Sequence, residues 1–178
     1  MKIIRVISLN PSLEVDFHPD SAMILPGRPL FLPDFGGPWR GRVHMAVRIC
    51  RLGKNIGVKF ASRYYDAVAL ALRVVECVEG EFAGVLSGMD STLVHGEWLD
   101  SSIANGPIRI ACGDVEESVA PVGAMIAEAI NKVSVYTTLK MGDIILLPVP
   151  HDMLVPLSER SRLALAIDGT PDLELKIV

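Results

Sequence analysis

The pattern that most limits the fold of this chain is a run of alternating residues in its first third. In the segment from Val43 to Arg51, apolar residues occupy every second position as far as Ile49. A period of two sends successive side chains to opposite faces of a strand, so this segment is predicted to be a half-buried β-strand. Other apolar runs predict further strands at residues 3–9, 67–77, 108–112, 144–147, 163–167 and 173–178.

One segment has the spacing of an amphipathic helix of substantial length. Its apolar positions share one helical face and are Met125, Ile126, Ala129, Ile130 and Val133. A shorter helix is predicted at residues 60–64. Glycine and proline predict a loop at residues 34–41 and a hairpin turn at residues 168–171. One long helix among many short strands predicts a single β-rich α+β domain over residues 1–178.

Composition excludes several classes of protein. Half of the 178 residues are apolar and 21% are charged, which excludes a disordered chain. No apolar run reaches the ~18 residues that a membrane-spanning helix needs, and the start shows no signal-peptide pattern. We therefore expect a cytoplasmic protein without a membrane partner. The net charge is −4, and no aromatic residue stands among the basic residues between Arg40 and Lys54, so we expect no nucleic-acid partner.

Neither the cysteines nor the common catalytic motifs indicate a type of reaction. Cys50, Cys77 and Cys112 form no C-x-x-C pair, so we expect free thiols. The patterns G-x-S-x-G, H-E-x-x-H, G-x-G-x-x-G and the P-loop are absent. The mean hydropathy of +0.39 is high, which predicts either a large core or a surface held against a partner subunit.

Several segments, taken in order, resemble the fumarylacetoacetate hydrolase family, in particular its shorter bacterial members. They are PDSA (19–22), FLPDF (31–35), VRICRLGKNI (47–56), KFASRYYD (59–66), GMDSTLVHGEW (88–98) and TLKMGDIILLPVP (138–150). The last is similar to the family pattern T-L-x-x-G-D-x-I-x-T-G-T-P. The resemblance implies a mixed β-roll with short helices. It also implies a homodimer, or a heteromer with a catalytically intact relative.

The resemblance further implies where family members hold a divalent cation, namely Mg²⁺, Mn²⁺ or Ca²⁺. Their E-x-E pair falls at Arg42 and His44, and their aspartate on the next strand falls at Arg73. Since a guanidinium never loses its proton and a hard cation needs anionic oxygens, the metal is predicted to be lost. The family lysine falls at Ser87, and the T-G-T-P loop becomes residues 147–150, with Pro148 and Val149 at its centre.

Two interpretations of Arg42, His44 and Arg73 stay open at this stage. The arginines can form an anion pocket that grips a carboxylate or phosphate directly. Alternatively the site has drifted, and the arginines pair with acids such as Glu76, Glu79 or Asp90, or reach solvent.

These interpretations give three functions. The first is a non-catalytic family member, or pseudoenzyme, that binds a small anionic metabolite or an intact paralogue. The second is a metal-independent hydrolase, isomerase or decarboxylase acting on a small oxo-acid, with His44 as general base. The third is a purely structural partner subunit.

Predictions of lesser weight concern five other polar or aromatic residues. Asp143 stands in a Gly-Asp turn and is predicted to accept backbone N–H groups rather than to act in catalysis. The resemblance implies that Asp90 and Trp98 frame the pocket wall. It also implies that Glu14 and His18 are remnants of an acidic-histidine lid.

Overall fold

The computed structural model of this chain describes residues 1–25, 27–76, 83–113, 115–149 and 153–178. The strands and helices in chain order are β1 Ile3–Ser8, β2 Glu14–His18, η1 Asp20–Ala22, β3 Trp39–Ile49, η2 Val58–Arg63, β4 Tyr65–Glu76, α1 Ala83–Leu86, β5 Leu93–His95, β6 Leu99–Asp100, η3 Ser101–Asn105, β7 Ile108–Cys112, β8 Val115–Val119, α2 Gly123–Tyr136, β9 Ile144–Pro148, β10 Leu154–Pro156, β11 Arg162–Ile167 and β12 Thr170–Lys176. The predicted β-rich α+β class is confirmed.

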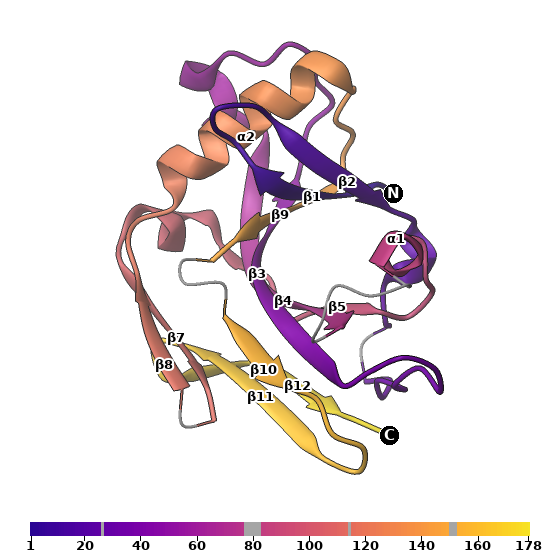
Figure 1. The fold of residues 1–178 in the computed structure, drawn as a ribbon. Coiled ribbons are helices and arrows are strands. Elements are labelled where there is room, and N and C mark those ends of the chain that lie inside the picture. The colour runs from indigo at the N-terminus through magenta and orange to yellow at the C-terminus, as the bar shows by residue number, and fades with distance from the viewer. Residues whose placement is uncertain (26, 77–82, 114, 150–152) are drawn as a thin grey trace.

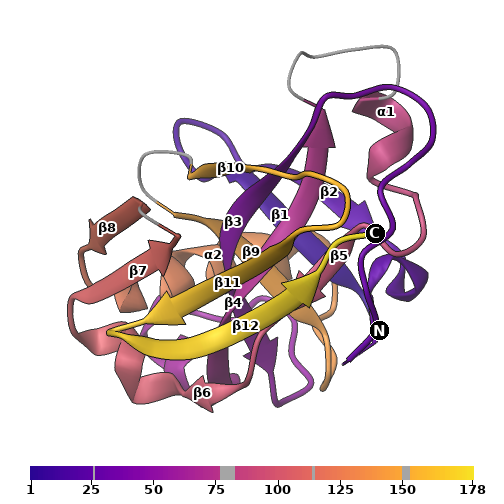
Figure 2. The same cartoon turned by 90° about the horizontal axis from the view of Figure 1, so that it is seen from below.

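The described strands form two sheets. The larger has the order β2-β1-β9-β3-β4-β5, with β10 paired to β3 and β6 paired to β4. The smaller has the order β12-β11-β7-β8. Figure 1 shows β3 and β4 curving along the length of the molecule, with the smaller sheet at one end and α2 at the other. Seen from below in Figure 2, the β11–β12 hairpin lies over the larger sheet, where β12 contacts β4.

The antiparallel pair β3–β4 is the centre of the larger sheet. The predicted strand from Val43 is confirmed, and its apolar positions are buried in the main core. The prediction of a loop over residues 34–41 is wrong at its end, because β3 begins at Trp39. Trp39 is buried, and Gly41 packs so closely against Leu72 that a Cβ atom would collide with it. The glycine here permits close packing in a strand instead of making a turn.

Helix α2 buries the face that the sequence predicts. Ile126, Ala129, Ile130 and Val133 are buried in the main core, and the helix extends beyond the predicted segment at both ends. The predicted short helix is the 3₁₀ helix η2, which packs against α2. None of the helices in the described ranges is both long and apolar enough to cross a membrane.

The predicted hairpin turn closes β11 and β12 with only two residues, Asp168 and Gly169. Both have positive φ, 48° and 79°, as a tight antiparallel hairpin requires. β12 therefore begins at Thr170, earlier than predicted. Strands β2 and β8 were not predicted, because each is short, lies at a sheet edge and is largely polar. Cys50 and Cys112 are free thiols, as expected, and Cys77 lies outside the described residues.

Candidate functional site

Arg42, His44 and Arg73 share one face of the larger sheet. In the β3–β4 register Arg42 lies directly opposite Arg73, and His44 lies opposite Ala71. On its other side His44 lies opposite Pro148 of β9. Since alternate residues of a strand point to the same face, these side chains lie on one face in two adjacent rows across the sheet, Arg42 with Arg73 and His44 with Pro148. The structure therefore brings together four of the candidate site residues.

The remaining candidates are placed differently. Val149 is buried in the main core cluster, which includes Val43 and Met45 from the opposite face of β3. Ser87 follows α1 and is half-buried. Trp98 packs on a separate buried cluster of the site face, which contains the small residues of β3 and β4 and supports the expected wall position. Arg48 lies over the Trp98 ring, with its guanidinium carbon 5.3 Å from the ring centroid.

His44 is a buried imidazole in a positive environment. Only 2% of the residue is exposed. Burial lowers its pKa to about 3, and the charges of Arg73, Arg5 and Arg42 add to this effect, while the Leu147 backbone opposes it weakly. The ring is therefore neutral at pH 7, with one N–H donor and one acceptor nitrogen. Within the described parts of the chain, neither ring nitrogen makes a well-formed hydrogen bond, and the Leu147 backbone offers the ring only a weak one.

The alternative interpretation is that Arg42 and Arg73 form ion pairs with nearby acids. Arg73 is 7% exposed, so its guanidinium is largely removed from water. Asp90 is exposed, and among the described residues it forms no ion pair with either arginine. Glu79 and the side chain of Glu76 lie outside the described residues.

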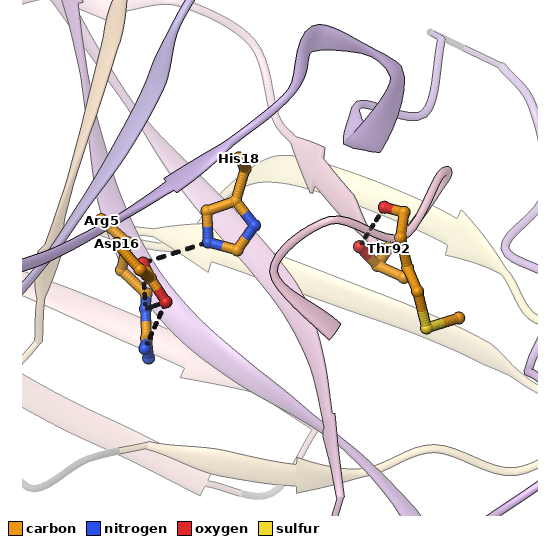
Figure 3. Close-up of polar contacts among 5 residues, drawn as sticks. Arg5, Asp16, His18 and Thr92 are labelled. Carbon is orange, nitrogen blue, oxygen red and sulfur yellow. Dashed lines mark hydrogen bonds and ion pairs between the residues drawn. The ribbon is translucent and has the colours of Figure 1, made fainter. Parts of the chain in front are cut away.

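A second cluster of polar residues lies on the same face, and the sequence did not predict that its members meet. Arg5 donates two hydrogen bonds to Asp16 from Nε and Nη2, at 2.9 and 2.7 Å. His18 Nε2 lies 3.2 Å from Asp16 Oδ1, and the His18 side chain is fully buried (Figure 3). The register places Arg5 opposite both Asp16 and Leu146, which carries this row to the His44 face.

The residue beside His18 is Asp16, not Glu14, and the expectation of a lid remnant stays a prediction. By alternation Glu14, Asp16 and His18 share one side of β2, but Glu14 is exposed at the start of the strand, whereas His18 is buried and contacts Asp16. The acid beside His18 is therefore Asp16. Burial alone would raise the pKa of Asp16, but hydrogen bonds from His18 and Arg5 hold it well below its usual value. The alternation in the segment EVDFH was the sequence signal that could have identified this pair.

Asp143 has the structural role that the sequence predicts. Its carboxylate accepts the backbone N–H groups of Lys2 and Lys140 at 2.8 and 2.9 Å. It also accepts a hydrogen bond from Lys2 Nζ at 2.6 Å. These contacts hold its pKa below the usual value although burial opposes the shift. Asp143 fixes the end of β9 against the N-terminal strand and is not part of the site.

The residues at the three predicted ligand positions do not offer the anionic oxygens that a hard divalent cation needs. Of the three residues at the family's ligand positions, only His44 has an atom able to coordinate a metal, since guanidinium groups have no free lone pair. Across the described ranges, no group of three or more His, Cys, Asp or Glu side chains is arranged to hold an ion. Mg²⁺ and Mn²⁺ prefer carboxylate and carbonyl oxygen, so this donor set does not fit them.

Comparisons with known proteins give a match in structure but not in sequence. The chain matches no protein-family model and no curated protein. It superposes with a TM-score of 0.83 on the 5-carboxymethyl-2-hydroxymuconate delta-isomerase of Mycobacterium smegmatis, at 19% identity, over 99% of this chain and 76% of that one. For fumarylpyruvate hydrolase of Pseudomonas aeruginosa, solved with Mn²⁺ and pyruvate, the TM-score is 0.78 at 14% identity, over 100% and 89% of the two chains.

A third similar structure carries the name of the expected family. It is a protein of Yersinia pestis described as belonging to the fumarylacetoacetate hydrolase family, with a TM-score of 0.77 and 14% identity over 99% of this chain and 93% of that one. At these identities the comparison establishes the fold. The chain has the fold that the sequence resemblance predicts.

Proposed function

We propose that this protein is a member of the fumarylacetoacetate hydrolase family that binds a small carboxylate directly, without a metal, and does not carry out the family's metal-dependent reaction. The shared fold and the order of the resembling segments support membership. The substitutions at the ligand positions support the loss of the metal. We further propose that the protein acts as a homodimer or together with an intact family member.

The observation that carries the proposal is the buried His44 beside Arg42 and Arg73. Two unit charges 4 Å apart interact by about 4 kcal/mol at an effective dielectric constant of 20, so one arginine opposes a divalent cation by roughly twice that amount. The same field attracts a carboxylate. A carboxylate oxygen also supplies a stronger acceptor for the His44 N–H than the weak contact with the Leu147 backbone. The face thus favours an anion over a cation.

The ligand that we propose is a small 2-oxo acid. Pyruvate is bound in the similar structure from Pseudomonas aeruginosa, where Mn²⁺ is also present. In this chain the arginines would take over the role of holding the carboxylate.

His44 is poorly suited to act as a general base. A base works best when its pKa lies near the working pH, whereas the pKa of His44 is about 3. This argues for binding over the metal-independent enzyme with His44 as base. The Asp16–His18 pair is the alternative candidate for a catalytic role, because His18 Nε2 lies 3.2 Å from Asp16 Oδ1 on the same face of the sheet.

The test is titration calorimetry of the metal-free full-length protein with sodium pyruvate and, separately, with MnCl₂. We expect pyruvate to bind and Mn²⁺ not to bind. Arg42→Gln and Arg73→Lys should each weaken pyruvate binding at least tenfold, because each removes bidentate contacts worth about 1.4 kcal/mol or more. The control Arg162→Gln alters an exposed arginine of the smaller sheet and should change nothing.

Stoichiometric Mn²⁺ binding would overturn the loss of the metal. Pyruvate binding that is equally strong in all three variants would overturn the anion pocket. Circular dichroism of each variant separates loss of binding from loss of folding. Turnover of acylpyruvates that His18→Ala abolishes and His44→Ala does not would favour the enzyme over the binding protein.

A further inference from the structure

A group of basic residues gathers at the end of the molecule farthest from β11 and β12. We call it the basic apex, and its members are Arg51, Lys54, Lys59, Arg63 and Lys140. They come from the connection between β3 and β4 and from the loop after α2. Figure 1 shows this connection lying beside α2 at the top of the view.

Backbone contacts hold these separate segments together. Gly53 and Leu139 exchange two backbone hydrogen bonds of 3.0 and 2.9 Å. The Asn131 side chain of α2 donates to the Ile56 carbonyl at 2.7 Å. The apex is therefore a defined surface made from two parts of the sequence, rather than a collection of independent loops.

The positive charge of the basic apex is not cancelled locally. Within the described ranges, no carboxylate lies in ion-pair contact with any of its members. Lys59 and Arg63 lie over the Phe60 ring, with their charged groups 4.9 and 5.4 Å from its centroid. Arg51 lies over the Tyr64 ring at 5.9 Å. The chain as a whole carries a net charge of −4, so this surface is opposite in sign to the rest of the molecule.

Large apolar side chains project from the same surface. Leu52, Tyr136 and Met141 are 65%, 77% and 77% exposed. Val58 and Phe60 are also exposed. Exposure this high means that Leu52 and Met141 stand out from the surface, whereas Tyr136 also borders a shallow pocket formed with Pro11 and Leu13. Cations around projecting apolar groups match a partner that offers both negative charge and an apolar interior.

The chemistry of the apex distinguishes among partners. A second copy docked through the same surface would bring cations against cations. Single-stranded nucleic acid binds best where aromatic rings are open for its bases to stack on. In the apex, cations already lie over the rings of Phe60 and Tyr64. Leu52 and Met141 have no ring on which a base could stack. A bilayer with anionic lipids attracts the cations, accepts projecting apolar groups and needs no matching shape.

We propose that the basic apex docks this protein onto an anionic phospholipid surface. The sequence-based expectation of no membrane partner rested on the absence of a spanning helix and did not consider a surface assembled from distant segments. The proposal is independent of the anion pocket, because the apex lies on the loops beyond the ends of β3 and α2 and not on the site face.

The test is co-sedimentation of the full-length protein with vesicles of phosphatidylcholine containing 30% phosphatidylserine, and with vesicles of phosphatidylcholine alone. We expect binding to the anionic vesicles only, weakened at least tenfold between 50 and 500 mM NaCl. The double substitution Lys59→Glu and Arg63→Glu should abolish binding, and Met141→Ser should weaken it severalfold. These side chains are exposed, so the fold should persist, which circular dichroism checks.

The matched control is Arg28→Glu with Arg162→Glu, two exposed arginines near the smaller sheet. It makes the same change in net charge and should bind as well as the natural protein. Equal loss of binding in the control would show that only net charge matters and would overturn the docking surface. The proposal would also fail if the vesicles do not bind at 50 mM NaCl, or if poly-glutamate or single-stranded RNA binds where vesicles do not.

Discussion

Replacing Asp172 by asparagine is expected to stabilise this protein above pH 6, with a benefit that shrinks toward pH 4. Asp172 is buried, and its Oδ2 accepts the Leu70 backbone N–H at 3.0 Å. Leu70 lies between the part of β4 that pairs with β5 and the part that pairs with β6. Asp172 thus joins the smaller sheet to an open stretch of the β4 edge. Its other oxygen has no partner within the described residues.

The size of the expected stabilisation follows from the pKa of Asp172. Burial raises the pKa of Asp172 from its ordinary 3.8 to about 6, with the negative charge of Glu97 adding to the shift and the Leu70 hydrogen bond opposing it. A raised carboxyl pKa means that the folded state holds its proton more tightly than the unfolded state. Stability from this group is complete below the unfolded pKa and falls as pH rises to about 6. The loss is about 3 kcal/mol at most, at 1.36 kcal/mol for each pKa unit.

Asparagine keeps an acceptor for the Leu70 N–H and never ionises. The difference in unfolding free energy between Asp172→Asn and the natural protein should therefore grow with pH and level off near pH 7. Urea unfolding followed by tryptophan fluorescence at several pH values between 4 and 8 measures it. The control Glu174→Gln changes an exposed carboxylate on the same strand and should show no such rise. A pH-independent difference, or an asparagine variant that is less stable at pH 8, would refute the reasoning.

Two further substitutions test the account of the fold by urea unfolding. Asp143→Ala should destabilise the protein by roughly 2–4 kcal/mol at pH 7, since it removes the acceptor of two backbone N–H groups and of Lys2 Nζ. A loss below 0.5 kcal/mol would contradict that role. Gly41→Ala should cost about 1–3 kcal/mol, because the new Cβ meets Leu72, whereas Gly106→Ala should be neutral because no atom lies within 4 Å of its Cβ position. Equal effects of the two alanines would contradict the packing argument.

Local pattern predicted the parts of the fold that have a buried apolar face. Each of these features follows from a pattern of a few neighbouring residues: the alternation in β3, the apolar face of α2 and the Asp168-Gly169 turn. Strands β2 and β8 were missed because an edge strand receives its hydrogen bonds from a neighbour and needs few apolar residues. The sequence predicts a later start for β3 because glycine is typical of turns, whereas Gly41 lies inside the strand.

The candidate site was likewise predictable only in part from local sequence pattern. Alternation alone places Arg42 and His44 on one face, but only the pairing of β3 with β4 places Arg73 opposite Arg42. The Arg5–Asp16–His18 group forms within the β1–β2 hairpin, but its position on the His44 face depends on β1 lying next to β9. That contact joins residues far apart in the sequence, and no local pattern of charges or apolar residues indicates it. The burial that keeps His44 neutral likewise comes from packing across several strands.

The parallel pairing of β1 with β9 also sets an order of events during synthesis. Lys2 and Asp143 are bonded although they stand 141 positions apart. When β1 leaves the ribosome, one of its two partner strands has not yet been made. The β1–β2 hairpin can form early, but it must wait for β9 before it joins β3. Such distant pairing slows folding and leaves a strand edge exposed on the nascent chain, where early association with another chain is the main hazard.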